Sequence, residues 1–173
     1  MFEIRRETAE DIEAIGCVNE KAFGQKQERE LVDKLRQHGK LILSLVAVED
    51  GKIVGHIAFS PVMVESEDGS FSAVTLAPLA VLPQRQKQGI GTKLINTAIG
   101  HCRKLGHELI FLVGHSQYYP RFGFIKAGEK GIKCEFKAPP EAFMLLELKP
   151  DALAGRTGIV KFQPAFHEAI EAM

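Results

Sequence analysis

Apolar residues at intervals of three and four predict three amphipathic helices along the chain. The first begins after Thr8, a residue type that caps helix N-termini, and the second covers residues 27–38, up to Gly39. The third begins beside Gly91 and ends at Gly106, with one apolar face along its length. That face consists of Ile90, Leu94, Ile95, Ala98, Cys102 and Leu105.

Strand-type patterns occupy most of the remaining chain. Asp50-Gly51, between two apolar runs, predicts a tight hairpin, and a turn at residues 67–69 extends it to an antiparallel meander. Pro78, inside the last strand of the meander, cannot donate a ladder hydrogen bond and predicts a bulge or an edge. The wholly apolar residues 109–113 predict a central strand, parallel to that last strand because a helix connects the two. The expected strands are residues 2–6, 41–49, 52–65, 70–82, 109–113, 124–127, 142–148 and 158–162.

Composition is that of an ordinary globular protein and argues against several function classes. The 173 residues suit a single domain, 1–173, with a core over 1–149 and a C-terminal extension over 150–173. The 22 basic residues balance 22 acidic ones, so no net charge attracts nucleic acid or an anionic membrane. Neither a signal region nor an apolar run of membrane-spanning length is present. Three widely spaced cysteines without a CxxC pair suggest no metal site and no disulfide framework, so we expect a cytoplasmic protein.

Residues 79–95 contain a candidate ligand-binding turn. An apolar run ends at Pro83, a polar turn follows, and Gly89 and Gly91 flank the first residue of a helical pattern. Glycine lets the backbone approach a ligand, and the first turn of a helix presents N–H groups without intrahelical partners. Such a place binds phosphate. The plainer interpretation is a glycine turn that only packs a helix on a sheet.

Two motifs on this framework resemble the GCN5-related N-acetyltransferase (GNAT) superfamily. The first is Gln86-x-x-Gly89-x-Gly91, which follows a Leu-Ala-Val-x-Pro strand end at residues 79–83. The second is Tyr119-x-x-x-Gly123-Phe124, after the next strand, and segments 118–124 and 143–148 are similar to the bacterial YhbS-like branch. The resemblance covers nearly the whole chain. It implies an α/β fold with a mixed sheet of about seven strands, helices on both faces and a splayed centre that binds acyl-CoA.

The resemblance also implies which residues bind acetyl-CoA, the cosubstrate. Backbone groups of the splayed strand would hold the pantetheine arm, and amides of the turn would hold the pyrophosphate. Lys87 stands where the family commonly has glycine, and with Arg85 and Lys93 it adds positive charge beside the phosphates. The expected acetyl-CoA contacts are Leu79, Ala80, Val81, Gln86, Lys87, Gln88, Gly89, Ile90, Gly91 and Thr92.

The chemistry is attack of a neutral amine on a thioester, which needs an acid and a base. Tyr119 occupies the position of the family's acid and can donate a proton while neutral at pH 7; otherwise its ring only packs the short helix expected over residues 118–122. Many relatives use a glutamate as base, but here Thr75 stands at about that place. His115, at the end of the central strand, is the first candidate instead. The others are His56, Glu65 and Glu28.

We therefore expect an N-acetyltransferase that moves an acetyl group from acetyl-CoA directly to a primary amine of a small molecule or peptide. No cysteine is placed as an acyl carrier, and Cys102 belongs to the core. The alternative is a non-catalytic acyl-CoA-binding or sensing protein with the same fold, favoured by the missing glutamate. A nucleotide-binding P-loop fails because residues 89–93 lack its spacing. The sequence specifies neither the acceptor amine nor the oligomeric state, although a homodimer is common in the family.

Overall fold

The computed structural model describes residues 1–172, which form two compact units built from separated stretches of the chain. The first unit comprises Met1–Ser60, Ala77–His101 and the C-terminal stretch that begins at Gln163. The second comprises Pro61–Leu76 and Cys102–Phe162. Three elements contribute residues to both units: β3 (Lys52–Ser66), β4 (Gly69–Val81) and α3 (Ile90–Lys104). The expected single domain over 1–173 stays a prediction.

The strands belong to one mostly antiparallel sheet, which confirms the mixed α/β prediction. Seven strands lie in the order β1 (Glu3–Arg6), β2 (Leu43–Glu49), β3, β4, β5 (Leu109–Val113), β8 (Phe143–Glu147) and β6 (Ile125–Lys126). In addition, β9 (Gly158–Lys161) pairs with β3, and β7 (Ile132–Cys134) pairs with β9. About seven strands with a separate short strand in the tail were expected, so β7 is the addition. No helix among residues 1–172 combines the length and the apolar character that a membrane span needs.

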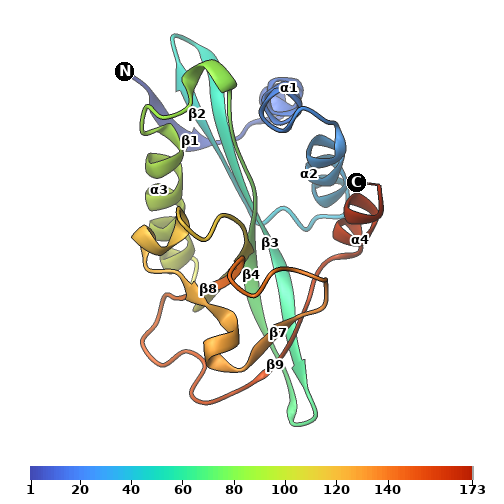
Figure 1. Cartoon of the computed structure of the whole chain (residues 1–173). Coiled ribbons are helices and arrows are strands. Elements are labelled where there is room, and N and C mark those ends of the chain that lie inside the picture. Colours follow the sequence, from blue (N-terminus) through green and yellow to red (C-terminus); the bar gives the residue numbers. More distant parts are fainter. Residues whose placement is uncertain (173) are drawn as a thin grey trace. The chain divides into compact units, whose positions relative to one another are not determined.

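The first unit carries helices on both faces of its strands, as expected (Figure 1). On one face Val46 of β2 packs with Ile15 of α1 and Val32 of α2. On the other face a side chain at Gly55 would lie 3.0 Å from Ile90 and 3.1 Å from Leu94, so glycine there lets α3 approach the sheet closely. The elements of this unit, besides parts of β3, β4 and α3, are β1 (Glu3–Arg6), α1 (Ile12–Phe23), α2 (Gln27–Gln37), β2 (Leu43–Glu49) and α4 (Pro164–Glu171).

Local chemistry explains where these elements begin and turn. Thr8 caps the first helical segment in a capping box with Asp11, as predicted. Asp50 and Gly51 both have positive φ, 51° and 76°, which a two-residue hairpin turn requires. Helix α4 was missing from the expectations, which gave the tail only a turn and a strand. Its Glu168 pairs with Lys34 of α2, so a contact across a long stretch of sequence supports this short helix.

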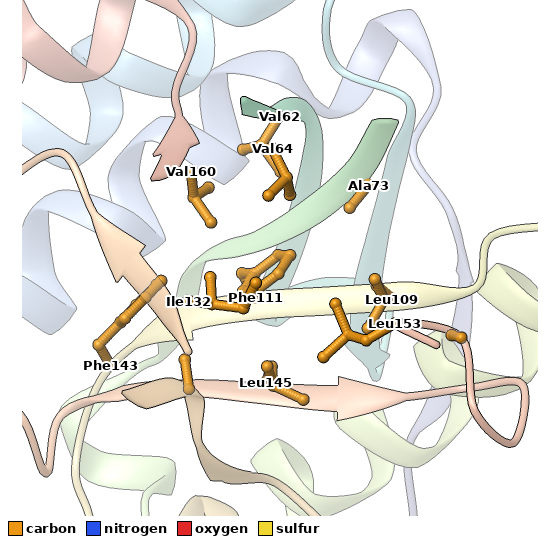
Figure 2. Packing of buried hydrophobic residues seen from close by; sticks show 12 residues of the cluster. Val62, Val64, Ala73, Leu109, Phe111, Ile132, Phe143, Leu145, Leu153 and Val160 are labelled. Atoms are coloured by element: carbon orange, nitrogen blue, oxygen red, sulfur yellow. The ribbon is translucent and has the colours of Figure 1, made fainter. Parts of the chain in front are cut away.

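The second unit surrounds the strand at residues 109–113, which is buried as predicted. Val74 and Thr75 of β4 pair in parallel with Ile110 and Phe111, and β8 pairs with the other edge of β5. Phe111 lies in the middle of the apolar cluster in Figure 2, and its ring stacks on that of Phe143 with the centroids 5.9 Å apart. The strands of this unit, besides parts of β3 and β4, are β5 (Leu109–Val113), β6 (Ile125–Lys126), β7 (Ile132–Cys134), β8 (Phe143–Glu147) and β9 (Gly158–Lys161).

Candidate functional site

The predicted turn between strand and helix is present in the first unit. A short 3₁₀ turn, Pro83–Arg85, follows β4, and α3 begins at Ile90. Between them Lys87 and Gly89 take the left-handed conformation, with φ of 63° and 86°. Lys87 therefore keeps the backbone geometry of the glycine common at its position in the family, although a side chain in that conformation costs about 1–2 kcal/mol.

Side-chain amides fix the shape of this turn. Gln86 donates from Nε2 to the carbonyl of Val81 over 3.1 Å, and Gln88 donates from Nε2 to the carbonyl of Gln84 over 3.3 Å. The N–H of Lys93 donates to the carbonyl of Gly89 over 3.0 Å, which is the first i to i−4 bond of α3. The amides before Lys93 are directed out of the helix end, where a positive partial charge favours anions.

The register of β4 determines which of its backbone groups face outward. Leu82 donates from its N–H to the carbonyl of Val54 in β3, over 3.0 Å. Because backbone groups alternate between the two edges of a strand, Ala80 also faces β3, whereas Leu79 and Val81 face the opposite edge. The Val81 carbonyl is occupied by Gln86. The Ala77–Pro78 peptide bond is cis, and the bulge expected at Pro78 stays a prediction.

Of the three basic residues assigned to the phosphates, two have partners inside the first unit. The Arg85 guanidinium pairs with Glu49, whose carboxylate is also 3.8 Å from the N-terminal ammonium. The ammonium of Lys93 lies 5.1 Å from the centroid of the Phe2 ring. Lys87 is exposed on the turn itself. The charge most available to a ligand of the turn is therefore that of Lys87.

Tyr119, the predicted acid, is buried in the second unit at the start of a 3₁₀ turn that ends at Gly123. Its ring makes edge contacts with Tyr118 and Phe124, at centroid distances of 5.2 and 5.8 Å. Burial, and to a lesser extent Tyr118, raises the pKa of Tyr119 to about 12. The hydroxyl thus stays protonated throughout the physiological pH range and is available as a hydrogen-bond or proton donor.

His115 lies in the same unit, on the loop that follows β5. Its side chain is exposed, and its backbone carbonyl accepts hydrogen bonds from the N–H groups of Tyr118 and Tyr119, over 3.1 and 3.4 Å. The loop therefore places His115 one turn before Tyr119. The ten residues expected at acetyl-CoA all lie in the first unit, on one continuous stretch of chain.

His56, another candidate base, is a fully buried member of a polar network in the first unit. Asn19 Nδ2 lies 3.1 Å from its Nδ1, and Ser44 Oγ lies 2.9 Å from its Nε2. Ser44 also donates to Glu7, which accepts two hydrogen bonds of 2.9 Å from Arg36. Burial lowers the pKa of His56 to about 4, so its ring is too weak a base to deprotonate an ammonium.

Three further side chains named from the sequence have ordinary structural partners. Thr75 is buried and donates from its hydroxyl to the Phe111 carbonyl over 2.9 Å, so it cannot serve as a base. Glu28 accepts from the Gln25 amide on the surface of the first unit. Burial raises the pKa of the Cys102 thiol to about 12, which fits its expected place in the core.

Sequence reasoning missed the polar network of Glu7, Asn19, Arg36, Ser44 and His56. Glu7 directly follows β1, the other members come from two helices and two strands, and no spacing along the chain relates them. The local signals were His56 in the apolar stretch of β3 and Ser44 between two leucines in β2.

Comparisons with known proteins show the family to which the chain belongs. The family described as acetyltransferase (GNAT) domain matches residues 3–127. The uncharacterized N-acetyltransferase YhbS of Escherichia coli K12 is 34% identical over 165 residues, which cover 95% of this chain and 98% of that protein. A second E. coli K12 protein, the uncharacterized N-acetyltransferase YjhQ, is 41% identical over 76% of this chain and 74% of its own.

Solved structures of relatives extend the likeness to three dimensions. The crystal structure of E. coli YhbS in complex with CoA superposes with a TM-score of 0.91, at 33% identity, over 96% of this chain and 92% of that chain. A GNAT family acetyltransferase from Brucella melitensis, in complex with acetyl-CoA, gives a TM-score of 0.80 at 37% identity over 96% of this chain and 98% of that chain.

Replacing Lys87 by glycine should stabilise the protein. The change relieves the left-handed strain but also gives the unfolded chain more freedom, which leaves a net gain of about 0.5–1 kcal/mol in the free energy of unfolding. Lys87→Ala removes the same charge and keeps the strain, so its unfolding free energy should stay near that of the wild type. Urea unfolding of both variants measures the difference. Equal stability of the two would contradict the strained geometry.

The buried His56 should make the protein less stable as the pH falls from about 6.5 to about 4. In that window the unfolded chain binds a proton on this residue and the folded chain does not. A pKa difference of this size removes up to about 3 kcal/mol from the free energy of unfolding. Urea unfolding at several pH values measures the slope, which His56→Gln should flatten. His107, whose pKa is also lowered by burial, supplies the control substitution His107→Gln, with a smaller effect.

Proposed function

The chain belongs to the GNAT family of N-acetyltransferases, and we propose that it transfers an acetyl group from acetyl-CoA to a primary amine of a small molecule or peptide. The observation that carries this proposal is the turn at residues 86–92, with two left-handed residues directly before a helix N-terminus. The likeness to relatives solved with CoA and acetyl-CoA, over 96% of the chain, supports it.

Acetyl-CoA carries a pyrophosphate, which suits the amides at the start of α3. Left-handed Lys87 and Gly89 turn the chain so that the N–H groups of Ile90 and Gly91 are directed out of the helix. The exposed ammonium of Lys87 adds a charge on the same turn. We assign Gln86 and Gln88 the role of holding this shape, since their side-chain amides bind backbone carbonyls of the preceding residues.

The pantetheine arm of acetyl-CoA contains amides that can pair with a strand. Leu79 and Val81 face the edge of β4 that is turned away from β3, and β4 pairs with β5 at Val74 and Thr75. We assign the pantetheine to Leu79 and Val81, and the oxyanion of the tetrahedral intermediate to the Leu79 N–H. Ala80 contributes its small side chain, because its backbone groups face β3.

In the reaction the amine nitrogen attacks the thioester carbon, and the carbon–sulfur bond then breaks to release the CoA thiolate. Tyr119 donates a hydrogen bond to this sulfur. Full proton transfer from a phenol of pKa about 12 to a thiolate, whose thiol has a pKa near ~8.5, would be uphill by about 5 kcal/mol. Tyr119 therefore stabilises the departing thiolate as a donor and keeps its own proton, and the thiol is completed by solvent.

The attacking amine must first lose a proton, which we assign to His115. An alkyl ammonium has a pKa near ~10.4 and is almost wholly charged at pH 7. His115 is exposed on the loop before Tyr119, and its imidazole can take the proton directly or through a water. The three free cysteines fit a reducing compartment, so we place the reaction in the cytoplasm.

Tyr119→Phe should lower kcat by about 10²-fold or more, the usual contribution of a positioned acid or donor. Thiol release from acetyl-CoA over a panel of amines measures kcat, and calorimetry should show an unchanged Kd for acetyl-CoA. Tyr118→Phe, which removes a hydroxyl from the neighbouring ring, is the matched control and should retain kcat. An unchanged kcat in Tyr119→Phe would contradict the role of Tyr119 as donor to the leaving thiolate. If the wild type binds acetyl-CoA but releases no thiol with any amine, the non-catalytic acyl-CoA-binding alternative is favoured.

His115→Ala should change the acidic limb of the plot of kcat/KM against pH, leaving only the part that comes from the amine itself. The rate of the variant should depend on the fraction of free amine alone, because no side chain then collects the proton. His167→Ala, an exchange of a histidine on α4, is the control and should keep the wild-type profile. A His115→Ala profile that retains the wild-type acidic limb rules out this residue as the base.

A further inference from the structure

Gly114, directly after β5, is a glycine that the backbone does not require. Its φ lies outside the left-handed region, so any residue could adopt its conformation. A side chain there has no room, however. A Cβ on Gly114 would lie 2.5 Å from Cε2 of Tyr119 and 3.1 Å from Cδ2 of the same ring, while Leu112 would be 3.4 Å away.

The closest contact is at the functional end of the ring. Cε2 is bonded to Cζ, the atom that carries the hydroxyl, and it is closer to Gly114 than Cδ2 is. Carbon atoms in contact are normally about 3.5–4.0 Å apart, so a methyl group at position 114 would have to move this edge by about 1 Å. The hydroxyl would move with it.

Neither partner can yield without cost. The N–H of Gly114 donates to the Ala142 carbonyl over 2.9 Å, directly beside the pairing of Val113 with Phe143. The Tyr119 ring is 8% exposed and is held between Tyr118 and Phe124. Because both backbone and ring are fixed, their separation sets the position of the Tyr119 hydroxyl.

We propose that Gly114 is a positioning residue for Tyr119, whose missing side chain lets the phenol hydroxyl occupy the place from which it donates. This inference rests on the proposed function of Tyr119. It assigns Gly114 no contact with acetyl-CoA or with the amine. The substitution Gly114→Ala should therefore act on the reaction only through the Tyr119 hydroxyl.

A double-mutant cycle in the thiol-release assay tests the inference. Gly114→Ala should lower kcat by about 10–10²-fold, the loss expected from a displacement of about 1 Å, with an unchanged Kd for acetyl-CoA. In the Tyr119→Phe background the same substitution should change kcat by less than about twofold, because coupled residues are not additive. Gly128→Ala is the matched control, since a Cβ on Gly128 meets nothing within 4 Å and its φ is not left-handed.

The outcomes separate this inference from the proposed function. If Tyr119→Phe retains kcat, the donor role fails and Gly114 has nothing to position. If Tyr119→Phe loses kcat but Gly114→Ala does not, or costs the same factor in both backgrounds, only the positioning role is overturned. Should Gly114→Ala fail to fold, adding Tyr119→Leu removes the ring edge and must restore folding; continued failure also overturns the inference.

Fluorescence gives a readout that needs no acceptor amine. The chain has two tyrosines and no tryptophan, so in Tyr118→Phe only Tyr119 emits when the light excites tyrosine and not phenylalanine. In that background Gly114→Ala should make acrylamide quenching of Tyr119 at least about twice as efficient, since a displaced ring loses its close packing. The far-ultraviolet circular dichroism spectrum should be unchanged. Quenching equal to that of Gly128→Ala would show that the ring has not moved and would overturn the inference.

Discussion

One backbone hydrogen bond, from the Leu82 N–H to the Val54 carbonyl, sets the register on which the acetyl-CoA assignment depends. It fixes which residues of β4 face β3, and by alternation it turns Leu79 and Val81 to the opposite edge. A shift of one residue would present Ala80 there instead. Leu82 lies between the end of β4 at Val81 and the 3₁₀ turn that begins at Pro83, so the same bond also holds the start of this turn against β3. Close packing of Gly55 against α3 then holds the helix at this position.

The sequence predicted most of this framework because its signals are local. The Asp50-Gly51 turn, the apolar strand at residues 109–113 and the face of α3 are each encoded within a few neighbouring positions. Helix α4 and strand β7 escaped for the opposite reason. The first depends on a distant partner such as Lys34, and the second pairs with β9, so their short sequences carry little of their own stability. In the candidate site, the turn could be predicted from its glycines, but left-handed Lys87 could be inferred only from the family pattern.

The network around His56 shows why residue type alone does not identify a catalytic base. A histidine in solution would be well suited to take a proton near neutral pH, but desolvation removes that capacity from His56. Its ring instead links Asn19 to Ser44, and through Ser44 to Glu7 and Arg36. In Glu7, hydrogen bonds from Arg36 and Ser44 outweigh burial and lower the carboxyl pKa, so the charge stays on the carboxylate. These hydrogen bonds join buried polar groups from several elements, which stabilises their arrangement but gives His56 no role as a base.

Thr75 stands at about the place where many relatives have a glutamate as base. How much the reaction needs a base depends on the pKa of the acceptor amine. Thr75 is committed to the Phe111 carbonyl, so no group at this place takes a proton. At pH 7 the deprotonation of an alkyl ammonium of pKa near ~10.4 costs about 4.6 kcal/mol, whereas that of an α-ammonium group of pKa near ~8 costs only about 1.4 kcal/mol. A base therefore matters more for the first kind of acceptor, by about 3 kcal/mol at most. We expect an exposed residue such as His115 to suffice as the base for an α-amino acceptor. For an alkyl amine it suffices only if the amine is held close to it.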